Sequence, residues 1–221
     1  MTVNENHIYP LTPVSSQAHV EEVREKCFDE LLSHYPIVDN GIFKGVVRCE
    51  DLEEASASDT LNGVNHLWEN IYVTDNASDW TRLFAKFLSE ETNVLPLIDR
   101  DRHYLGVFLL EDLLEELSEI KAFAEDGTVI RVQHHADDFK MSQVAQVVEA
   151  TGSKLLGILL VDETPEHTVA DIKVQTRDLN EILQTLRRYD YLILSKHPED
   201  RHLQDLKENA EYLERYLKMG E

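Results

Sequence analysis

Histidine and carboxylate side chains gather in one short stretch of the chain, His134-His135-Ala136-Asp137-Asp138. Imidazole nitrogens and carboxylate oxygens are ligands that suit zinc and similar ions. Adjacent histidines on a β-strand point to opposite faces, so at most one of them can join the carboxylates. A solvated loop therefore explains the stretch better than a metal site, and we expect no bound metal.

Other motifs that would indicate chemistry are absent from the sequence. It contains no G-x-x-x-x-G-K-[ST] phosphate loop, no G-x-G-x-x-G, no H-E-x-x-H and no G-x-S-x-G. Serine, histidine and aspartate all occur, but spacing alone cannot assemble a catalytic triad. We therefore expect no catalytic residues. The stretch from His134 to Asp138 is the one sequence feature that would indicate an enzyme.

The two cysteines, Cys27 and Cys49, lack the C-x-x-C spacing of metal or redox sites. Buried free cysteine behaves as a small apolar residue. Both are predicted to be ordinary core or near-surface cysteines.

The elements that would position a site belong to an internal repeat. Residues 34–52 return about sixty residues later as residues 94–113. Each copy reads as a β-hairpin that feeds a helix, with carboxylates in the first helical turn. Asn40-Gly41 marks the first turn, although the five residues between Asp39 and Gly45 indicate a looser loop than a two-residue turn. The matching pairs are Pro36 and Pro96, Asp39 and Asp99, Gly45 and Gly106, and Glu50-Asp51-Leu52 and Glu111-Asp112-Leu113.

An amphipathic helix is predicted before each hairpin. Apolar residues recur there at i, i+3, i+7 and i+8, which is helical spacing. Ser78 or Asp79 would cap the second helix. Each repeat therefore reads strand–helix–strand–strand–helix. The matched apolar positions are Val20 and Trp80, Val23 and Leu83, Cys27 and Phe87, and Phe28 and Leu88.

These repeats resemble a tandem pair of CBS domains, at residues 8–57 and 65–120. Residues 1–7 read as a loose tail, and the segment from Ala55 to Thr60 reads as a connector. The resemblance implies a compact pair with a cleft between the two repeats that binds adenosine nucleotides such as AMP, ATP or S-adenosylmethionine. It rests mainly on the two hairpin ends that begin at Gly45 and Gly106.

The resemblance also implies which residues would contact the ligand. The family's ribose-binding aspartate corresponds to Asp51 and to Asp112, and a carboxylate can accept hydrogen bonds from two ribose hydroxyls. The family's hydroxyl residue is replaced by Arg48 in the first copy and by Leu109 in the second. Arg48 could pair with a phosphate instead. Both aspartates could equally serve only as helix caps, so the two interpretations stay open.

The remaining chain predicts a second kind of domain at residues 127–196. Its element order, β-α-β-β-α-β, is ferredoxin-like. With Gly152 after its first helix and Arg188-Tyr189-Asp190-Tyr191 after its second, it resembles an ACT domain. A CBS pair followed by an ACT-like domain is the layout of acetoin-utilisation-type regulatory proteins. By that resemblance, the stretch from His134 to Asp138 lies where ACT-like domains bind small effectors.

An amphipathic helix is expected at residues 198–219. Its apolar residues have coiled-coil spacing, so it would either pair with a second copy or pack on its own chain. These residues are Leu203, Leu206, Ala210, Leu213 and Leu217.

Composition narrows the function. The 221 residues include 43 acidic and 21 basic ones, for a net charge of −22, which argues against binding nucleic acid or anionic membranes. The acidic surface is either a solvated one, as in a protein from a high-salt host, or a docking face. With no apolar span and no leader, we expect a cytoplasmic protein.

Together these features predict an α+β protein with a regulatory role. We expect a non-enzymatic, ligand-sensing homodimer with a nucleotide cleft and an effector-binding ACT-like domain. The alternative is a structural adaptor whose nucleotide sites have decayed.

Overall fold

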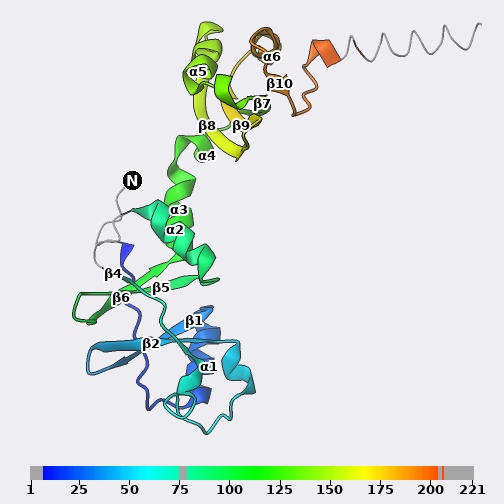
Figure 1. Ribbon diagram of the computed structural model, residues 1–221. Coiled ribbons are helices and arrows are strands. Elements are labelled where there is room, and N and C mark those ends of the chain that lie inside the picture. The colour runs from blue at the N-terminus through cyan, green and yellow to red at the C-terminus, as the bar shows by residue number, and fades with distance from the viewer. Residues whose placement is uncertain (1–6, 75–78, 204–205, 207–221) are drawn as a thin grey trace, which may run out of the picture. The chain divides into compact units, whose positions relative to one another are not determined.

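The computed structural model describes residues 7–74, 79–203 and 206 (Figure 1). The chain divides into two compact units, Met1–Leu117 and Ser118–Glu221, which are described separately below. Helices and short sheets alternate in the first unit, and one antiparallel sheet organises the second. The expected α+β fold class is therefore confirmed.

The first unit contains the same arrangement twice. The first repeat consists of α1 (Val20–Asp29), β1 (His34–Asp39), β2 (Ile42–Arg48) and a short 3-10 helix (Asp51–Glu54). The second consists of a short 3-10 helix (Asn65–Leu67), β3 (Trp68–Glu69), β4 (Val73–Thr74), α2 (Trp80–Ser89), β5 (Val94–Ile98), β6 (Tyr104–Leu109) and α3 (Leu110–Glu119). In both repeats the helix precedes the hairpin, as the sequence predicts.

The two repeats exchange strands. β3 lies on the second strand of the first hairpin, where Trp68 is the antiparallel partner of Val47. Tyr9, which precedes the first repeat, lies on the second hairpin and exchanges two backbone hydrogen bonds with Val107, at 2.8 and 3.0 Å. Val107 in the second hairpin corresponds to Val46 in the first, which is the neighbour of Val47. Each hairpin is therefore paired at the same place with a segment of the other repeat.

Two glycines make this exchange possible. A Cβ atom on Gly45 would lie 2.8 Å from the carbonyl oxygen of Glu69, and one on Gly106 would lie 2.9 Å from that of Tyr9. Gly106 also has a φ of +142°, which L side chains rarely adopt. The matched glycines are thus the places where each exchanged strand crosses a hairpin.

The cores of the two repeats are shared as well. Val94 and Val107 of the second repeat pack in the core of the first, and Phe43 and Val46 of the first pack in the core of the second. Close packing of this kind leaves each repeat dependent on the other for burial of its apolar face.

Each helix buries a narrower stripe than its sequence pattern predicts. Val20, Val23 and Cys27 are buried on α1, but Phe28 is 79% exposed. On α2 the matched Leu88 is 62% exposed. Helical position i+8 lies beyond the contact with the sheet, so the apolar stripe in the sequence is wider than the buried one.

Two local expectations also need correction. The first hairpin closes through a two-residue turn, Asn40-Gly41, with both φ angles positive, rather than through a looser loop. The helix expected after it is only the single 3-10 turn Asp51–Glu54. Arg24 caps that turn by donating hydrogen bonds to the carbonyls of Leu52, Glu53 and Ala55, so no further helical turns are needed to satisfy them.

The cysteines form a disulfide, which the sequence interpretation missed. Cys27 on α1 is bonded to Cys49, the residue after β2, with their Cα atoms 6.1 Å apart. The helix packs across the hairpin and brings the two residues together. Residues 22 apart in sequence carry no local pattern that reveals this.

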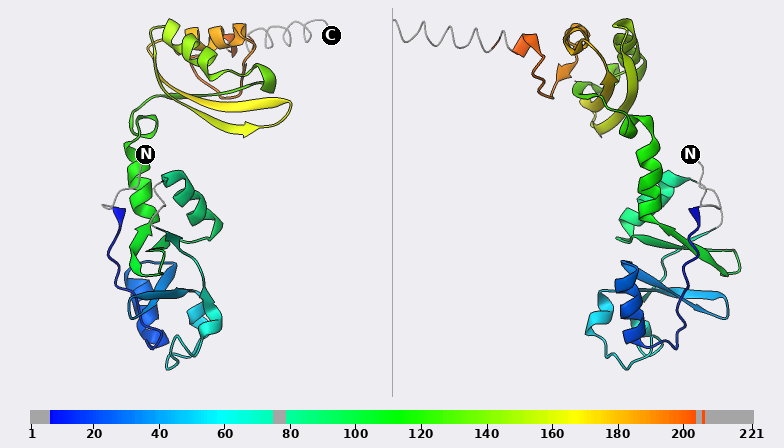
Figure 2. Two further views of the ribbon diagram at one scale, coloured as in Figure 1. Left: turned by 60° about the vertical axis from the view of Figure 1, so that its left-hand side comes forward. Right: turned by 180° about the vertical axis from the view of Figure 1, so that it is seen from behind.

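The second unit has the expected ferredoxin-like strand order. Its four strands are arranged β10-β7-β9-β8, and every neighbouring pair is antiparallel. Both long helices lie on one face of the sheet (Figure 2). The elements are α4 (Lys121–Ala124), β7 (Thr128–His135), a 3-10 helix (Ala136–Asp138), α5 (Met141–Ala150), β8 (Lys154–Glu163), β9 (His167–Gln175), α6 (Leu179–Arg188) and β10 (Leu192–Ile193).

Sequence periodicity explains the core of this unit. Alternate residues of β7 and β9, such as Ile130 and Ile172, face the stripe of valines on α5 and of leucines on α6. Gly152 ends α5 with a φ of +69°, as its position in the sequence predicts. The expected C-terminal helix, residues 198–219, lies largely outside the described residues; 201–203 and 206 are helical. None of the helices in the described ranges is both long and apolar enough to cross a membrane.

Candidate functional site

An apolar pocket lies between α2 and α3 in the second repeat. The empty space between its walls, open solvent at the mouth included, is about 440 Å³. The walls come from both helices and from the end of β6, and three polar residues stand among them. The lining residues are His7, Trp80, Leu83, Phe87, Phe108, Leu109, Asp112, Leu113, Glu116 and Leu117.

Local structure places the polar groups of this pocket. The side chain of Asp79 caps α2 by accepting a 3.0 Å hydrogen bond from Thr81 N, which confirms one of the two predicted caps. α3 begins directly after β6, so Asp112 lies in its first turn, where a carboxylate is favoured. One turn later, Glu116 pairs with Nε2 of His7 at 2.9 Å.

The pocket combines an apolar interior with a carboxylate at its edge. Aromatic and leucine side chains form its walls, and a carboxylate can accept hydrogen bonds from a pair of hydroxyl groups. Asp112 is the predicted site residue that the structure places in this setting.

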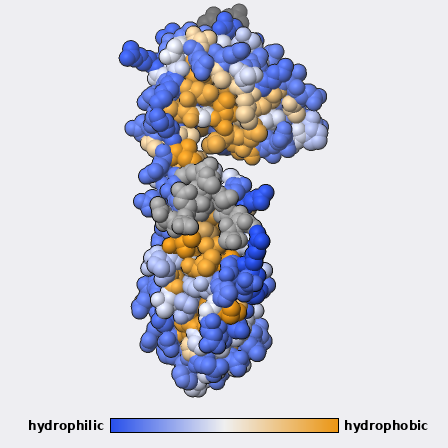
Figure 3. Space-filling view, turned by 90° about the vertical axis from the view of Figure 1, so that its left-hand side faces the viewer, coloured by the Kyte–Doolittle hydropathy of each residue, from blue (hydrophilic) through white to orange (hydrophobic). Residues whose placement is uncertain are grey.

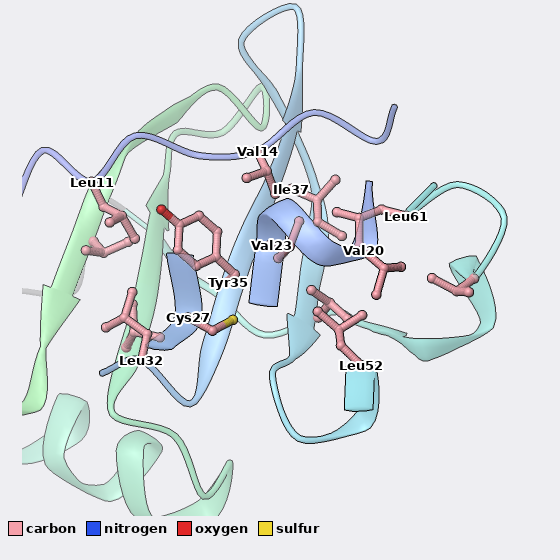
Figure 4. Packing of buried hydrophobic residues seen from close by; sticks show 14 residues of the cluster. Leu11, Val14, Val20, Val23, Cys27, Leu32, Tyr35, Ile37, Leu52 and Leu61 are labelled. Carbon is pink, nitrogen blue, oxygen red and sulfur yellow. The ribbon is translucent and has the colours of Figure 1, made fainter. Parts of the chain in front are cut away.

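The equivalent space in the first repeat is filled. Val20, Val23 and Leu52, which correspond to pocket residues of the second repeat, pack in one cluster with Leu61 and Val64. Figure 4 shows Leu61 beside Val20 and Leu52. The connector is held there by hydrogen bonds from Leu61 N to the carbonyl of Ala18 (3.0 Å) and from Val20 N to that of Asp59 (2.9 Å). Asp51 therefore stands next to a packed core.

Arg48 is already surrounded by acidic groups. Its guanidinium lies 3.7 Å from a carboxylate oxygen of Glu69 and 3.9 Å from one of Glu91. A phosphate at this position would have to compete with both carboxylates. The adjacent His34 is fully buried, with Nε2 3.3 Å from Glu69 and Nδ1 2.9 Å from Oγ of Ser33.

Burial controls the protonation of this histidine. Loss of solvent lowers the pKa of His34, and the positive charge of Arg48 lowers it further. Glu69 and Asp51 act in the opposite direction but do not reverse the shift. His34 is consequently a neutral core residue that accepts or donates one hydrogen bond within the first repeat.

The five predicted nucleotide-site residues thus divide between the repeats. Arg48 and Asp51 lie near His34 in the first repeat, while Asp112 lines the pocket of the second. Gly45 and Gly106 sit under the exchanged strands, where their missing side chains admit backbone.

The stretch from His134 to Asp138 is not arranged as a metal site. The ring of His134 packs against Tyr191 with centroids 4.4 Å apart, and its nitrogens lie near the carbonyl oxygens of Tyr189 and His135. Across the described ranges, the group whose ligand atoms approach within 4.8 Å is Asp99, Asp101 and His103 instead. There Asp99 already accepts hydrogen bonds from both other residues and closes the β5–β6 turn.

Sequence reasoning missed two parts of the site. His7 was assigned to a loose tail, and Leu61 and Val64 follow the predicted connector in residues 61–69, for which the sequence pattern indicates no clear element. Apolar residues in a stretch otherwise rich in polar ones were the available indication that the connector returns to the core. Trp68 is partly buried against that core, and its Nε1 donates a hydrogen bond to the carbonyl of Leu61 at 3.1 Å.

Comparisons place this architecture beside known structures. No family model matches the sequence, and no curated protein matches it. Similar solved structures include a CBS domain pair/ACT domain protein from Thermotoga maritima, with 25% identity over 54% of this chain and 98% of that chain and a TM-score of 0.47. The CBS domains of a transcriptional regulator from Streptococcus pneumoniae have 18% identity over 52% of this chain and 98% of theirs, with a TM-score of 0.45.

A third similar structure is CBSX2 in complex with AMP, with 17% identity over 52% of this chain and 96% of that chain and a TM-score of 0.44. Each of these three structures is matched over about half of this chain, 52–54% of its length.

Proposed function

We propose that the chain is a non-enzymatic, ligand-sensing regulatory protein whose first unit, residues 8–57 and 65–120, is a CBS domain pair with one adenosine-nucleotide site. One observation carries the proposal: Asp112 stands at the edge of an apolar pocket in the second repeat, while the equivalent space beside Asp51 is filled by Leu61 and Val64. The two matched aspartates therefore have different roles.

The ligand would use both parts of the pocket. A nucleobase is flat and largely apolar on its faces, which suits the aromatic walls formed by Trp80, Phe87 and Phe108. The two ribose hydroxyls suit the carboxylate of Asp112. Leu109, where the family has a hydroxyl, contributes only apolar contact, so we expect the affinity to come mainly from the base and ribose.

The second unit is proposed to be an ACT-like domain at residues 127–196, in an acetoin-utilisation-type layout, and to bind a small effector. We propose a homodimer that pairs through β8, the edge strand of its sheet. Leu159, Leu160 and Val161 on that strand are 45–48% exposed, and Figure 3 shows hydrophobic side chains gathered on the face of this unit that carries β8. A long apolar edge strand favours pairing with another strand.

The alternative function is a structural adaptor. It is favoured by the filled pocket of the first repeat and by the carboxylates that surround Arg48. An adaptor would need the shared fold of the first unit but no ligand in the second repeat.

Isothermal titration of the full chain with AMP, ATP and S-adenosylmethionine separates the two functions. We expect at least one nucleotide to bind, and Asp112→Asn to weaken it by about tenfold or more through loss of charged hydrogen bonds. Asp51→Asn is the matched control and should leave affinity unchanged. Silence from all three ligands would favour the adaptor, and a loss caused by Asp51→Asn instead would assign the site to the first repeat.

A cytoplasmic location remains part of the proposal, but the disulfide weighs against it, because reducing compartments keep most thiols free. Trapping thiols in intact cells before lysis tests this point. A disulfide found intact would indicate an oxidising compartment or a protected bond.

A further inference from the structure

The disulfide between Cys27 and Cys49 lies where the second repeat has no sulfur. By the alignment of the repeats, Cys27 corresponds to Phe87 and Cys49 to Leu110. Phe87 is buried, and Leu110 packs against the same core cluster. Apolar packing therefore provides this contact in the second repeat, and the fold itself does not require a crosslink. The cysteines give the first repeat a chemical capacity that packing does not explain.

The bond can be reached from solvent. Cys49 is partly exposed, whereas Cys27 is only 7% exposed. Both residues line a depression in the surface of the first unit. Arg24, Arg48 and three glutamates line it as well, so its positive and negative charges nearly balance. A small uncharged reagent can therefore approach Cys49 without strong electrostatic repulsion.

Backbone hydrogen bonds connect both cysteines to the turn between α1 and β1. The carbonyl of Cys27 accepts from Leu32 N at 3.1 Å, and Cys49 N donates to the carbonyl of Ser33 at 2.9 Å. The crosslink thus joins the two residues that hold this turn from either side. Opening the crosslink removes one of the constraints that keep Leu32 and Ser33 in place.

Ser33 also belongs to the junction between the repeats. Its N–H donates to Oδ1 of Asn93 at 2.8 Å, and Asn93 N donates to its Oγ at 3.0 Å. The carbonyl of Asn93 in turn accepts from N of Leu110, the first residue of α3, at 3.0 Å. A short series of hydrogen bonds therefore runs from Cys49 through Ser33 and Asn93 to α3. Contiguous contacts of this kind can carry coupling between two places in a protein, and the coupling is measurable.

We propose that the Cys27–Cys49 bond is a reversible exchange site for a small dithiol, and that its state sets how firmly the repeats are joined at Ser33 and Asn93. A thiolate of the dithiol attacks Sγ of Cys49, the more exposed sulfur. The S–S bond breaks, and Cys27 leaves as a thiolate that takes up a proton. The second thiol of the reagent then attacks the mixed disulfide and releases Cys49. Two electrons and two protons pass to the protein, and the reagent ends as a cyclic disulfide.

A reversible bond also agrees with the proposed cytoplasmic location. Disulfides in reducing compartments are mostly transient and often serve as redox sensors. A bond that opens and closes is compatible with such a compartment, whereas a permanent one is not. Thiol exchange at this bond is independent of whether the second repeat binds a nucleotide, so either can fail without the other.

Alkylation of the folded, full-length chain tests the exchange step. The protein is oxidised with hydroxyethyl disulfide and then treated with dithiothreitol, a small uncharged dithiol, without denaturant. Free thiols are trapped with N-ethylmaleimide and counted by mass. We expect no adduct before reduction and two after it, one for each cysteine of the chain, and a second oxidation of untrapped protein should restore the first state. Adducts that form only in denaturant, adducts in the oxidised protein, or reoxidation to a crosslinked dimer would overturn the proposal.

Amide hydrogen exchange of the oxidised and reduced protein tests whether the junction responds. We expect peptides that contain Ser33, Asn93 and Leu110 to exchange about tenfold faster or more after reduction, because local opening becomes easier. Peptides around Leu83 in α2 and along β9 should change by less than about threefold, since they would respond only to general unfolding or to the reductant itself. Unchanged exchange at Asn93 and Leu110 would overturn the proposed link, and so would an equal acceleration around Leu83.

Two double variants separate the effect of the bond from that of the junction. Cys27→Ala/Cys49→Ala should exchange like the reduced protein and should not respond to dithiothreitol. Ser33→Ala/Asn93→Ala keeps the disulfide but removes the side chains that join the repeats. In this variant reduction should still accelerate exchange at Cys49 by about tenfold, but at Leu110 by less than about threefold. A full response at Leu110 would show that reduction does not act through the junction, and a response of the alanine pair to dithiothreitol would show that it does not act through the cysteines; either would overturn the proposal.

Discussion

Ser33 and Asn93 occupy equivalent positions in the two repeats and bind directly to each other. Ser33 N donates to Oδ1 of Asn93 at 2.8 Å, and Asn93 N donates to Oγ of Ser33 at 3.0 Å. Asn93 Nδ2 also donates to the carbonyl of Leu31 at 2.9 Å. Equivalent residues meet in this way only near a local twofold relationship, so this pair marks where the two repeats join.

Removal of the Asn93 side chain tests that junction. We expect Asn93→Ala to lower the free energy of unfolding by about 1–3 kcal/mol, because Ser33 N–H and the Leu31 carbonyl lose their partner. Urea denaturation of Asn93→Ala, Ser33→Ala and the double variant should give a coupling energy above about 0.5 kcal/mol. Asn62→Ala, at an exposed position, is the control. Strictly additive losses would contradict a direct junction.

The disulfide should contribute measurably to stability. Cys27 and Cys49 close a loop with a sequence separation of 22 residues, and such a crosslink is worth about 2–4 kcal/mol through the unfolded chain. Urea denaturation with and without a phosphine reductant should show that difference in the unaltered protein. The variant Cys27→Ala/Cys49→Ala should have the same free energy of unfolding with and without the reductant. Two free thiols in the unreduced, folded protein would contradict the bond.

Gly106 should tolerate alanine much less well than Gly152. Both have positive φ angles, but a Cβ on Gly106 would lie 2.5 Å from Cγ2 of Ile8, whereas nothing lies within 4 Å of one on Gly152. We expect Gly152→Ala to cost about 1 kcal/mol and Gly106→Ala about 2–4 kcal/mol, since crowding adds to backbone strain. Similar losses in denaturant would show that the exchanged strand does not hold Ile8 and Tyr9 over this glycine.

Stability should fall when the pH drops through the ordinary range of histidine. Burial, reinforced by Arg48, holds the pKa of His34 below its unfolded value of about 6.5, so below that pH the unfolded chain takes up a proton that the folded state resists. The stabilisation is complete above about pH 6.5 and is lost as pH falls toward the lower folded pKa.

Unfolding free energies at several pH values between 7.5 and 5.5 test this prediction. His34→Gln should flatten the decline, and His66→Gln, an exposed control, should not. Asp39 and Asp171 have pKa values lowered mainly by hydrogen bonds, and their contribution is lost only below about pH 4, outside this window. An unchanged decline in His34→Gln would show that other groups cause it.

The repeat and the order of elements were predictable because they rest on local constraints. Pro36 and Pro96, and Gly45 and Gly106, recur at fixed spacing since each hairpin must be crossed by a strand at the same place. In the second unit, the alternation of apolar residues along β9 and the apolar stripe on α6 are local patterns that indicate a strand and a helix.

What the sequence could not reveal depends on contacts between distant segments. The Cys27–Cys49 bond requires the packing of α1 on the hairpin. The filled site beside Asp51 requires Leu61 to return beneath α1, although Asp51 and Asp112 look identical in their motifs. Exposure of Phe28 and Leu31 depends on where the sheet ends, which periodicity does not encode.

The exchange of strands at Tyr9 and at Trp68-Glu69 has a consequence for how this protein can change over time. Each half is the scaffold on which the other is completed, so neither can be deleted without loss of both. One copy is thereby free to lose its ligand while it still supports its twin. A duplicated module can in this way keep two folded repeats and only one binding site.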